Sequence, residues 1–331
     1  MPNNLKRRTW IFSYFTTADG ATYAYDYNPA HGSNLTFLLL HGYPSSHRDY
    51  EHQILSLTAA GYGTLAPDLL GLGRSDMPTE LEAYNMKRLA GHITELLDEK
   101  NLDTVIGVGH DWGALLLSRL AAYHQDRFQK LAFMSVGHTA PGGFFDLDAG
   151  IIQSQADFGY SRLGYWYFFH RHDAASVIEQ HLESAWCLWF SNNQTVWREH
   201  VGEIGASRAW LNADIITADP PGFDEAFKND WFTWMRRQGA AQAGLSYYKA
   251  LMDGLWEEDE NALPNEKWTL NVPVLTIGGS DDVISRPDIL DASTRPWAMA
   301  GYEARLVPGG HWVQHEAPEQ VSLYLLEFAR E

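Results

Sequence analysis

The sequence predicts an α/β protein with a doubly wound, mostly parallel sheet and an inserted helical cap. Short apolar runs of strand length alternate with helical patterns up to residue 137, which is typical of parallel sheets covered by helices. Over residues 138–258 the helical patterns continue without a convincing buried strand, and the alternation resumes over 259–331. We therefore expect a core built from residues 1–137 and 259–331, with residues 138–258 inserted as a cap domain.

The expected core strands are aromatic or continuously apolar. Two aromatic segments around the turn Asp19-Gly20 predict an antiparallel hairpin at the start of the chain. The apolar runs after it are of the kind that central parallel strands need. In order, the expected strand segments are Trp10–Phe15, Thr22–Tyr27, Leu35–Leu40, Gly61–Asp68, Thr104–Val108, Leu131–Val136, Val272–Ile277 and Tyr302–Val307.

The expected core helices are amphipathic. Met86–Lys100 and Pro318–Arg330 carry apolar residues at helical spacing, and a further helix begins at Gly113. The inserted segment holds most of the 13 tryptophans. Because aromatic rings gain much from burial and few can face one ligand, most of them should form the core of the insert. The acidic stretch Glu257–Pro264 is expected to connect the insert back to the sheet.

Charge and cysteine content exclude several classes of function. The chain has 331 residues and a formal net charge of −18, which disfavours nucleic acid as a partner. Cys187 is the single cysteine, so an internal disulfide and a cysteine-based metal site are excluded. The apolar run after Lys6-Arg7-Arg8 is too short for a signal peptide, and no apolar run reaches the length of about 18 residues that predicts a membrane span. We expect a soluble, cytoplasmic protein.

The most informative motif lies in Asp103–Leu117. Gly109 and Gly113 flank Asp111 at minus two and plus two, between an expected strand and an expected helix. Small residues at these positions permit a sharp turn that lifts one side chain above the sheet. A simpler interpretation makes Asp111 a helix N-cap that accepts backbone N–H groups. Partner residues further along the chain favour the first interpretation.

Those partners are a carboxylate and a histidine that each follow an expected strand. Asp111, Asp281 and His311 occur in the order nucleophile, acid, histidine. In open α/β sheets the carboxyl ends of the strands line the ligand crevice, so these side chains should meet there. Asp282 competes with Asp281 for the acid role, and His315 and His110 compete with His311. His110 should point away from the crevice as a structural histidine.

These motifs resemble the α/β-hydrolases, and the aspartate in place of serine resembles the branch that holds epoxide hydrolases and haloalkane dehalogenases. The resemblance covers nearly the whole chain, loosely in the cap. The family pattern G-x-x-D-x-V aligns with Gly278, Asp281 and Val283, which selects Asp281 and leaves Asp282 to cap or face solvent. The family loop G-G-H-W matches Gly309–Trp312 and selects His311.

The resemblance also implies a two-step mechanism. A carboxylate with a pKa near about 4 is ionised at neutral pH, so Asp111 needs no base to attack a saturated carbon. His311 is then free to activate the water that hydrolyses the resulting ester. The loop His41–Pro44 resembles the family's H-G-x-P loop, which makes backbone N–H groups of Tyr43 and Trp112 the expected oxyanion hole.

The leaving group separates the two activities of this branch. An opened epoxide gives an alkoxide that needs an acid, whereas a halide leaves as a stable anion. Epoxide hydrolases use two cap tyrosines, and the resemblance nominates Tyr165 within Gly164–Phe169 and Tyr248 within Leu245–Lys249. The neighbours Tyr167 and Tyr247 are the alternatives. The residues expected to contact substrate are His41, Pro44, Trp166 and Trp312, with Trp166 standing where the family usually has glutamine.

The sequence therefore predicts an epoxide hydrolase, without metal or cofactor, that converts an apolar or aromatic epoxide to a vicinal diol. Detoxification is the expected role and a small-molecule epoxide the expected partner, and a homodimer is one possible assembly. A haloalkane dehalogenase with the same Asp111 nucleophile is the first alternative. A ligand-binding relative without turnover is the second. A conventional esterase is disfavoured because the elbow lacks serine.

Overall fold

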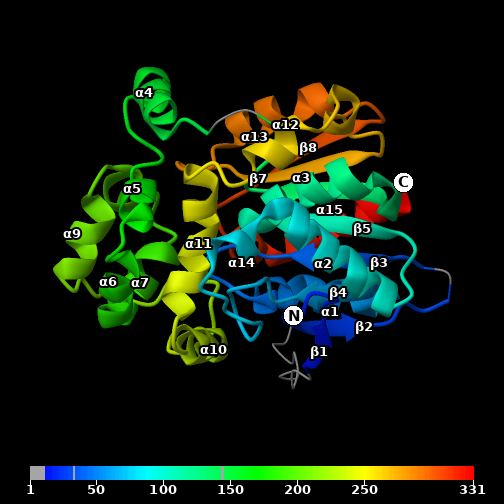
Figure 1. Ribbon diagram of the computed structural model, residues 1–331, viewed down its shortest axis with the longest axis horizontal. Coiled ribbons are helices and arrows are strands. Elements are labelled where there is room, and N and C mark those ends of the chain that lie inside the picture. The colour runs from blue at the N-terminus through cyan, green and yellow to red at the C-terminus, as the bar shows by residue number, and fades with distance from the viewer. Residues whose placement is uncertain (1–11, 33, 143–144) are drawn as a thin grey trace.

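The computed structural model describes residues 12–32, 34–142 and 145–331. Within them the strands form an 8-stranded sheet in the order β1-β2-β4-β3-β5-β6-β7-β8 (Figure 1). The pairs β1–β2 and β2–β4 are antiparallel, and all other neighbours in this sheet are parallel. The strands are β1 (Ser13–Thr16), β2 (Thr22–Asn28), β3 (Thr36–Leu40), β4 (Gly63–Pro67), β5 (Val105–His110), β6 (Phe128–Met134), β7 (Val274–Gly279) and β8 (Tyr302–Val307). The expected doubly wound, mostly parallel sheet is confirmed.

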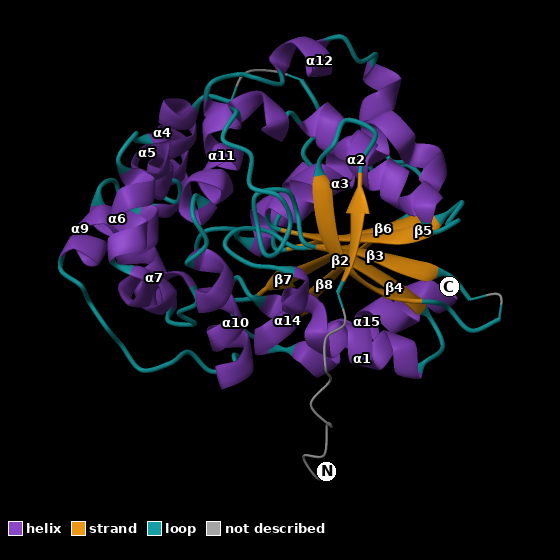
Figure 2. Cartoon of the chain, turned by 60° about the horizontal axis from the view of Figure 1, so that its bottom comes forward, coloured by secondary structure: helices purple, strands orange, loops and turns teal. Residues whose placement is uncertain are grey.

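Helices cover both faces of the sheet (Figure 2). On one face lie α2 (Met86–Glu99), α3 (Trp112–His124) and α13 (Pro287–Thr294), and on the other lie α1 (Glu51–Ala59) and α15 (Pro318–Arg330). Strand β3 shows why the run of residues 37–40 is continuously apolar. Phe37 and Leu39 pack under α1 and α15, whereas Leu38 and Leu40 pack on the opposite face. Because successive side chains alternate between two covered faces, every position must be apolar.

The described residues between β6 and β7 form helices and loops, and most of these helices lie to one side of the sheet (Figure 1). The helices are α4 (Leu147–Phe158), α5 (Tyr165–His170), α6 (Ala174–Gln180), α7 (Leu182–Trp189), α8 (Gln194–Val196), a π-helical stretch (Trp197–Gly202), α9 (Ala206–Asn212), α10 (Glu225–Met235), α11 (Ala240–Met252) and α12 (Glu257–Asn261). Trp186, Trp231 and Trp234 are among the largest fully buried side chains. The expectation that most tryptophans form the core of the insert is confirmed.

The expected connector Glu257–Pro264 is partly helical, since it contains α12. One of its acidic residues, Glu260, is buried and accepts hydrogen bonds from the Arg119 Nε and Nη2 atoms at 2.7 and 2.9 Å. The backbone N–H of Gly142 donates to the same carboxylate at 2.9 Å. The acidic connector therefore includes a side chain that ties the end of the insert to α3.

The remaining core elements are α14 (Val313–Glu316) and short 3₁₀ turns at His47–Tyr50, Leu81–Tyr84, Gln125–Arg127, Asn265–Trp268 and Arg295–Trp297. Strand β6 ends at Met134, two residues before the predicted end, because Ser135 has φ of 59° and leaves the extended conformation. The predicted strand start at Trp10 and the basic residues Lys6-Arg7-Arg8 lie outside the described residues. None of the helices in the described part is long and apolar enough to cross a membrane.

Candidate active site

Asp111 occupies a sharp turn between β5, which ends at His110, and α3, which begins at Trp112. Its backbone has φ of 53° and ψ of −122°, a conformation that L residues rarely adopt. A Cβ atom on Gly113 would clash with the Leu40 carbonyl group, and a Cβ on Gly109 would lie 2.5 Å from the Gly113 carbonyl oxygen. The Asp111 side chain makes no capping hydrogen bond to α3, so the N-cap interpretation is excluded.

The Asp111 carboxylate is held by the loop after β3. The backbone N–H of Tyr43 donates to Asp111 Oδ1 at 2.9 Å. A Cβ atom on Gly42 would collide with the same carboxylate, so only glycine fits there. The peptide bond between Tyr43 and Pro44 is cis. The geometry agrees with Tyr43 as one oxyanion donor, and the second donor, the Trp112 N–H, stays a prediction.

His311 lies between two carboxylates. Its Nε2 atom is 3.7 Å from Asp111 Oδ2, and its Nδ1 atom is 3.1 Å from Asp282 Oδ2. The other oxygen of Asp282 accepts the backbone N–H groups of Ile284 and Ser285 at 2.9 and 2.8 Å. The imidazole therefore has a fixed orientation, with one nitrogen toward Asp111 and the other toward a carboxylate that is itself held in place.

The choice of Asp281 as the histidine's partner is wrong. Asp281 is exposed, and its carboxylate accepts a hydrogen bond from its neighbour Ser280 at 3.2 Å. The error comes from the register of the G-x-x-D pattern. A Cβ atom on Gly279 would clash with the Gly310 carbonyl group, whereas one on Gly278 would meet only side chains at 3.1 Å or more. Counting three residues from the glycine that packing requires gives Asp282, not Asp281.

The two carboxylates determine the charge of His311. Burial lowers the pKa of His311, but the hydrogen bonds and negative charges of Asp111 and Asp282 outweigh it and raise this pKa to about 10. Burial acts to raise the pKa of Asp282, and the hydrogen bond with His311 and the two backbone N–H groups bring it below its usual value. Before any reaction, the site therefore holds a protonated imidazole between two carboxylates.

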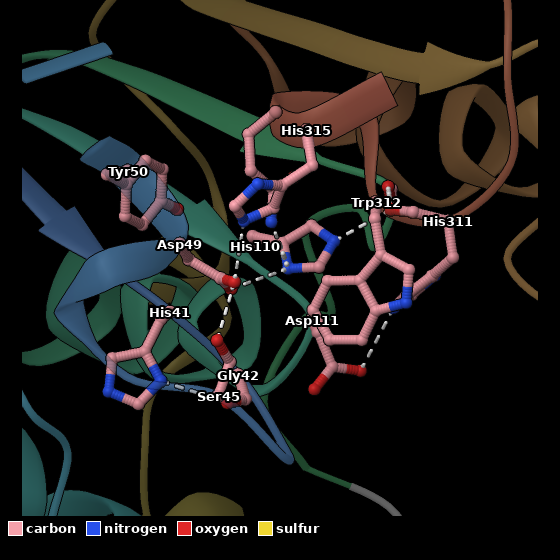
Figure 3. A network of polar contacts seen from close by, with 12 residues as sticks. His41, Gly42, Ser45, Asp49, Tyr50, His110, Asp111, His311, Trp312 and His315 are labelled. Carbon is pink, nitrogen blue, oxygen red and sulfur yellow. Dashed lines mark hydrogen bonds and ion pairs between the residues drawn. The ribbon is translucent and has the colours of Figure 1, made fainter. Parts of the chain in front are cut away.

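A buried polar network supports the loop of His311 (Figure 3). The His311 carbonyl oxygen accepts hydrogen bonds from Ser135 Oγ at 2.7 Å and from His110 Nε2 at 2.9 Å. Burial lowers the pKa of His110 to about 4, so its ring is neutral. Asp49 lies 3.3 Å from His315 Nε2 and accepts the Ser45 hydroxyl at 2.5 Å. His110 and His315 are thus structural, as expected for His110, and His311 alone faces Asp111.

A cavity of about 250 Å³ opens in front of Asp111 between the insert and the sheet. Its lining is mostly apolar and includes Trp112, Trp166 and the two nominated tyrosines, Tyr165 and Tyr248. The two tyrosine rings lie edge to face, with centroids 5.9 Å apart. Burial and the negative charge nearby raise the pKa of Tyr165 and of Tyr248 well above the usual value, so both hydroxyl groups keep their protons. The alternative Tyr247 donates instead to the Leu70 carbonyl at 2.8 Å.

A second, smaller cavity of about 30 Å³ lies on the His311 side of Asp111. Its lining includes His311, Pro44 and Trp312, together with Tyr165 and Tyr248. This volume is enough for a water molecule and too small for an organic substrate. Asp111 thus lines both cavities. The larger cavity is mostly apolar, and the smaller cavity lies beside the imidazole of His311.

Three of the four residues expected to contact substrate line a cavity: Trp166 the larger one, and Pro44 and Trp312 the smaller one. His41 lines neither, so its assignment is wrong. It is fully buried, and its Nε2 atom accepts the backbone N–H of Leu69 at 2.9 Å. Within the described residues, no cluster of three His, Cys, Asp or Glu side chains could hold a metal ion.

Sequence reasoning missed several residues of the site. Trp197 lies over His311 with ring centroids 5.2 Å apart, and Phe169 and Trp189 complete the smaller cavity. Arg162 lines the larger cavity. No local motif marks these positions, because they reach the site through the packing of the insert. The glycine that packing requires at position 279 was the one sequence signal that could have identified Asp282 as the partner of His311.

Comparison with known proteins agrees with this architecture. Residues 36–318 match the family model for the alpha/beta hydrolase fold. Epoxide hydrolase A of Mycobacterium tuberculosis is 27% identical, with 88% of this chain and 89% of the relative covered. An epoxide hydrolase of Caballeronia sordidicola is 26% identical, over 90% of this chain and 88% of the relative.

Solved structures give the same result. The crystal structure of epoxide hydrolase A from Mycobacterium thermoresistibile superposes with a TM-score of 0.78 at 25% identity, covering 97% of this chain and 98% of the other. An epoxide hydrolase from an endophytic Streptomyces superposes with a TM-score of 0.78 at 25% identity, covering 96% and 94%.

Proposed function

Because the chain belongs to the alpha/beta hydrolase fold family, we propose that it is an epoxide hydrolase in which Asp111 attacks the substrate and residues 138–258 act as the cap. One observation carries the proposal above all. Two protonated tyrosines, Tyr165 and Tyr248, line the same apolar cavity as the Asp111 carboxylate. A nucleophile beside two neutral O–H donors suits a leaving oxygen that must be protonated. The named relatives support the same activity.

In the first step, the Asp111 Oδ2 atom attacks a ring carbon of the epoxide. The carbon–oxygen bond breaks, and Tyr165 or Tyr248 gives its proton to the oxygen that leaves the carbon. The other carboxylate oxygen, Oδ1, stays on the Tyr43 N–H. The products are a covalent ester on Asp111 and a tyrosinate, which is reprotonated from solvent or by its neighbour.

In the second step, His311 takes a proton from water, and the resulting hydroxide attacks the ester carbonyl. Formation of the ester removes the charge of Asp111, which is one of the two charges that raise the pKa of His311. The pKa therefore falls after the first step, and the imidazole can release its proton and act as a base. Asp282 stabilises the imidazolium, the Tyr43 N–H stabilises the oxyanion, and collapse releases the diol.

The test is a panel of apolar and aromatic epoxides and of haloalkanes, assayed for diol and for halide. We expect diol from epoxides, no turnover by D111N, and a covalent adduct of substrate mass on H311Q in intact-protein mass spectrometry. Halide release without diol formation would identify a haloalkane dehalogenase instead. Binding without turnover of either class would identify a ligand-binding relative. D281N is the matched control, because Asp281 is exposed and does not contact His311.

The Asp111 step has its own test. A single turnover in ¹⁸O-labelled water should place the label in the Asp111 side chain, because the water attacks the ester carbonyl and not the substrate carbon. Label found in the diol alone would refute the nucleophilic role of Asp111. A cytoplasmic location, a homodimer and a role in detoxification remain predictions from the sequence.

A further inference from the structure

Arg162 is a charged residue in the wall of the larger, otherwise apolar cavity. It follows α4, and its Nη1 atom donates to the backbone carbonyl of Ile284. Its Nε atom is buried without a hydrogen-bond partner, and the guanidinium lies 5.8 Å from the ring centroid of Phe158. Among the described residues, no carboxylate lies within ion-pair distance of Arg162. Arg162 is half-buried, and a cation that is partly withdrawn from water without a counter-ion is costly, so its presence in the wall of a cavity requires a reason.

The neighbouring Arg286 shows the usual arrangement. It lines the same cavity, and its Nε and Nη2 atoms donate to the two oxygens of Asp288 at 3.0 and 3.1 Å. Its guanidinium stacks on the same Phe158 ring at 4.1 Å. The charge of Arg286 in the cavity wall is therefore neutralised by Asp288, whereas the charge of Arg162 has no carboxylate paired with it.

The acidic groups near Arg162 have other roles. Asp282 acts on it electrostatically, but its two oxygens are occupied by His311 and by the backbone N–H groups of Ile284 and Ser285. Burial lowers the pKa of Arg162, which shows the cost of keeping this charge out of water. The chain as a whole carries a net charge of −18, so a positive site within it is a local feature.

We propose that Arg162 is a subsite for an anionic group of the substrate, so that the natural substrate is an apolar epoxide that carries a carboxylate. This inference rests on the proposed epoxide hydrolase function. The apolar wall, including Leu163 and Trp166, would hold the hydrocarbon part, while the carboxylate would pair with the guanidinium. Arginine binds carboxylates with charge-assisted, often bidentate hydrogen bonds, and one nitrogen is already used on Ile284. The other two nitrogens share one edge of the guanidinium, and the Nε atom on that edge has no hydrogen-bond partner.

The test compares a chain-length series of terminal epoxyalkanoic acids with their methyl esters, which differ only in the charge. For the wild type, we expect the best acid to have a kcat/KM about tenfold or more above its ester, mainly through a lower KM. R162Q should lose that preference, because its kcat/KM for the acid should fall by about tenfold more than its kcat/KM for the ester, and R162K should retain part of the preference. R171Q is the matched control, because Arg171 is an exposed arginine of the same insert and does not line the cavity.

Equal kcat/KM values for acids and esters in the wild type would overturn the inference, as would an equal loss for both in R162Q, which would show a structural role only. In either case diol formation would leave the epoxide hydrolase function standing. A calorimetric comparison of saturated alkanoic acids with their methyl esters tests the subsite without turnover. If no epoxide is hydrolysed but the acids bind more tightly than the esters, the subsite stands and the proposed function fails. If R162Q does not fold, R162K and the wild-type comparison decide the question.

Discussion

Replacing Asp282 by asparagine should slow the hydrolysis of the ester far more than its formation. Asp282 contacts His311 at 3.1 Å, and its side chain has no exposed area. In the ester, Asp111 is uncharged, so Asp282 is the remaining carboxylate that stabilises the imidazolium. A charge-assisted hydrogen bond contributes roughly 1.5–3 kcal/mol, which corresponds to about 10- to 150-fold in rate. An amide that donates to Nδ1 would also favour the wrong tautomer, which raises the expected loss toward about 10⁴-fold.

The assay is a single turnover of an epoxide followed by stopped-flow tryptophan fluorescence, with Trp112 and Trp197 lying beside the reacting groups. Intact-protein mass spectrometry of quenched samples measures the ester. We expect D282N to form the ester and to accumulate it, which also shows that the variant is folded. D281N should stay within about twofold of the wild type. Loss of activity in D281N together with full activity in D282N would refute the assignment of Asp282.

Three further outcomes follow from the same geometry. The double variant Y165F/Y248F should lose epoxide turnover by at least about 100-fold, because no neutral O–H remains for the leaving oxygen; full activity would exclude both tyrosines as the acid. G42A should lose turnover although its core is unchanged, because the added Cβ collides with the Asp111 carboxylate; a crystal structure of G42A with Asp111 unmoved would contradict this. The pKa of His311 is raised to about 10, so its protonation stabilises the folded state fully below about pH 6.5 and progressively less as the pH rises toward 10. The free energy of unfolding of the wild type minus that of H311Q, from urea titrations, should therefore fall over this range, and a constant difference would show that the imidazole has no such coupling.

The core fold could be predicted because the central strands of the sheet are apolar runs between turn residues and the first two strands are rich in aromatic residues. Strand β8 has the predicted bounds, and so does helix α15. Asp111 could be predicted because the glycines that its turn requires lie within two residues of it. His311 could be predicted for a similar reason, since it follows the Gly309-Gly310 pair at the end of a strand.

The partner carboxylate could not be assigned in the same way, because two aspartates follow two glycines. Only the packing of Gly279 against Gly310, about 30 residues further along the chain, separates the two registers. The positions of Arg162 and Trp197 in the site could not be predicted from local sequence patterns, for a related reason. Helical periodicity places residues on a helix face, but which face meets the sheet depends on how the helices of the insert pack together.

The unequal cavities on the two sides of Asp111 also determine how the reaction must end. The chamber beside His311 has about 30 Å³, so the epoxide and the diol must both occupy the larger cavity in front of Asp111. While a diol remains there, no second substrate molecule can approach the nucleophile. Bulky diols should therefore act as competitive inhibitors, and for them departure of product, instead of chemistry, should govern the steady-state rate.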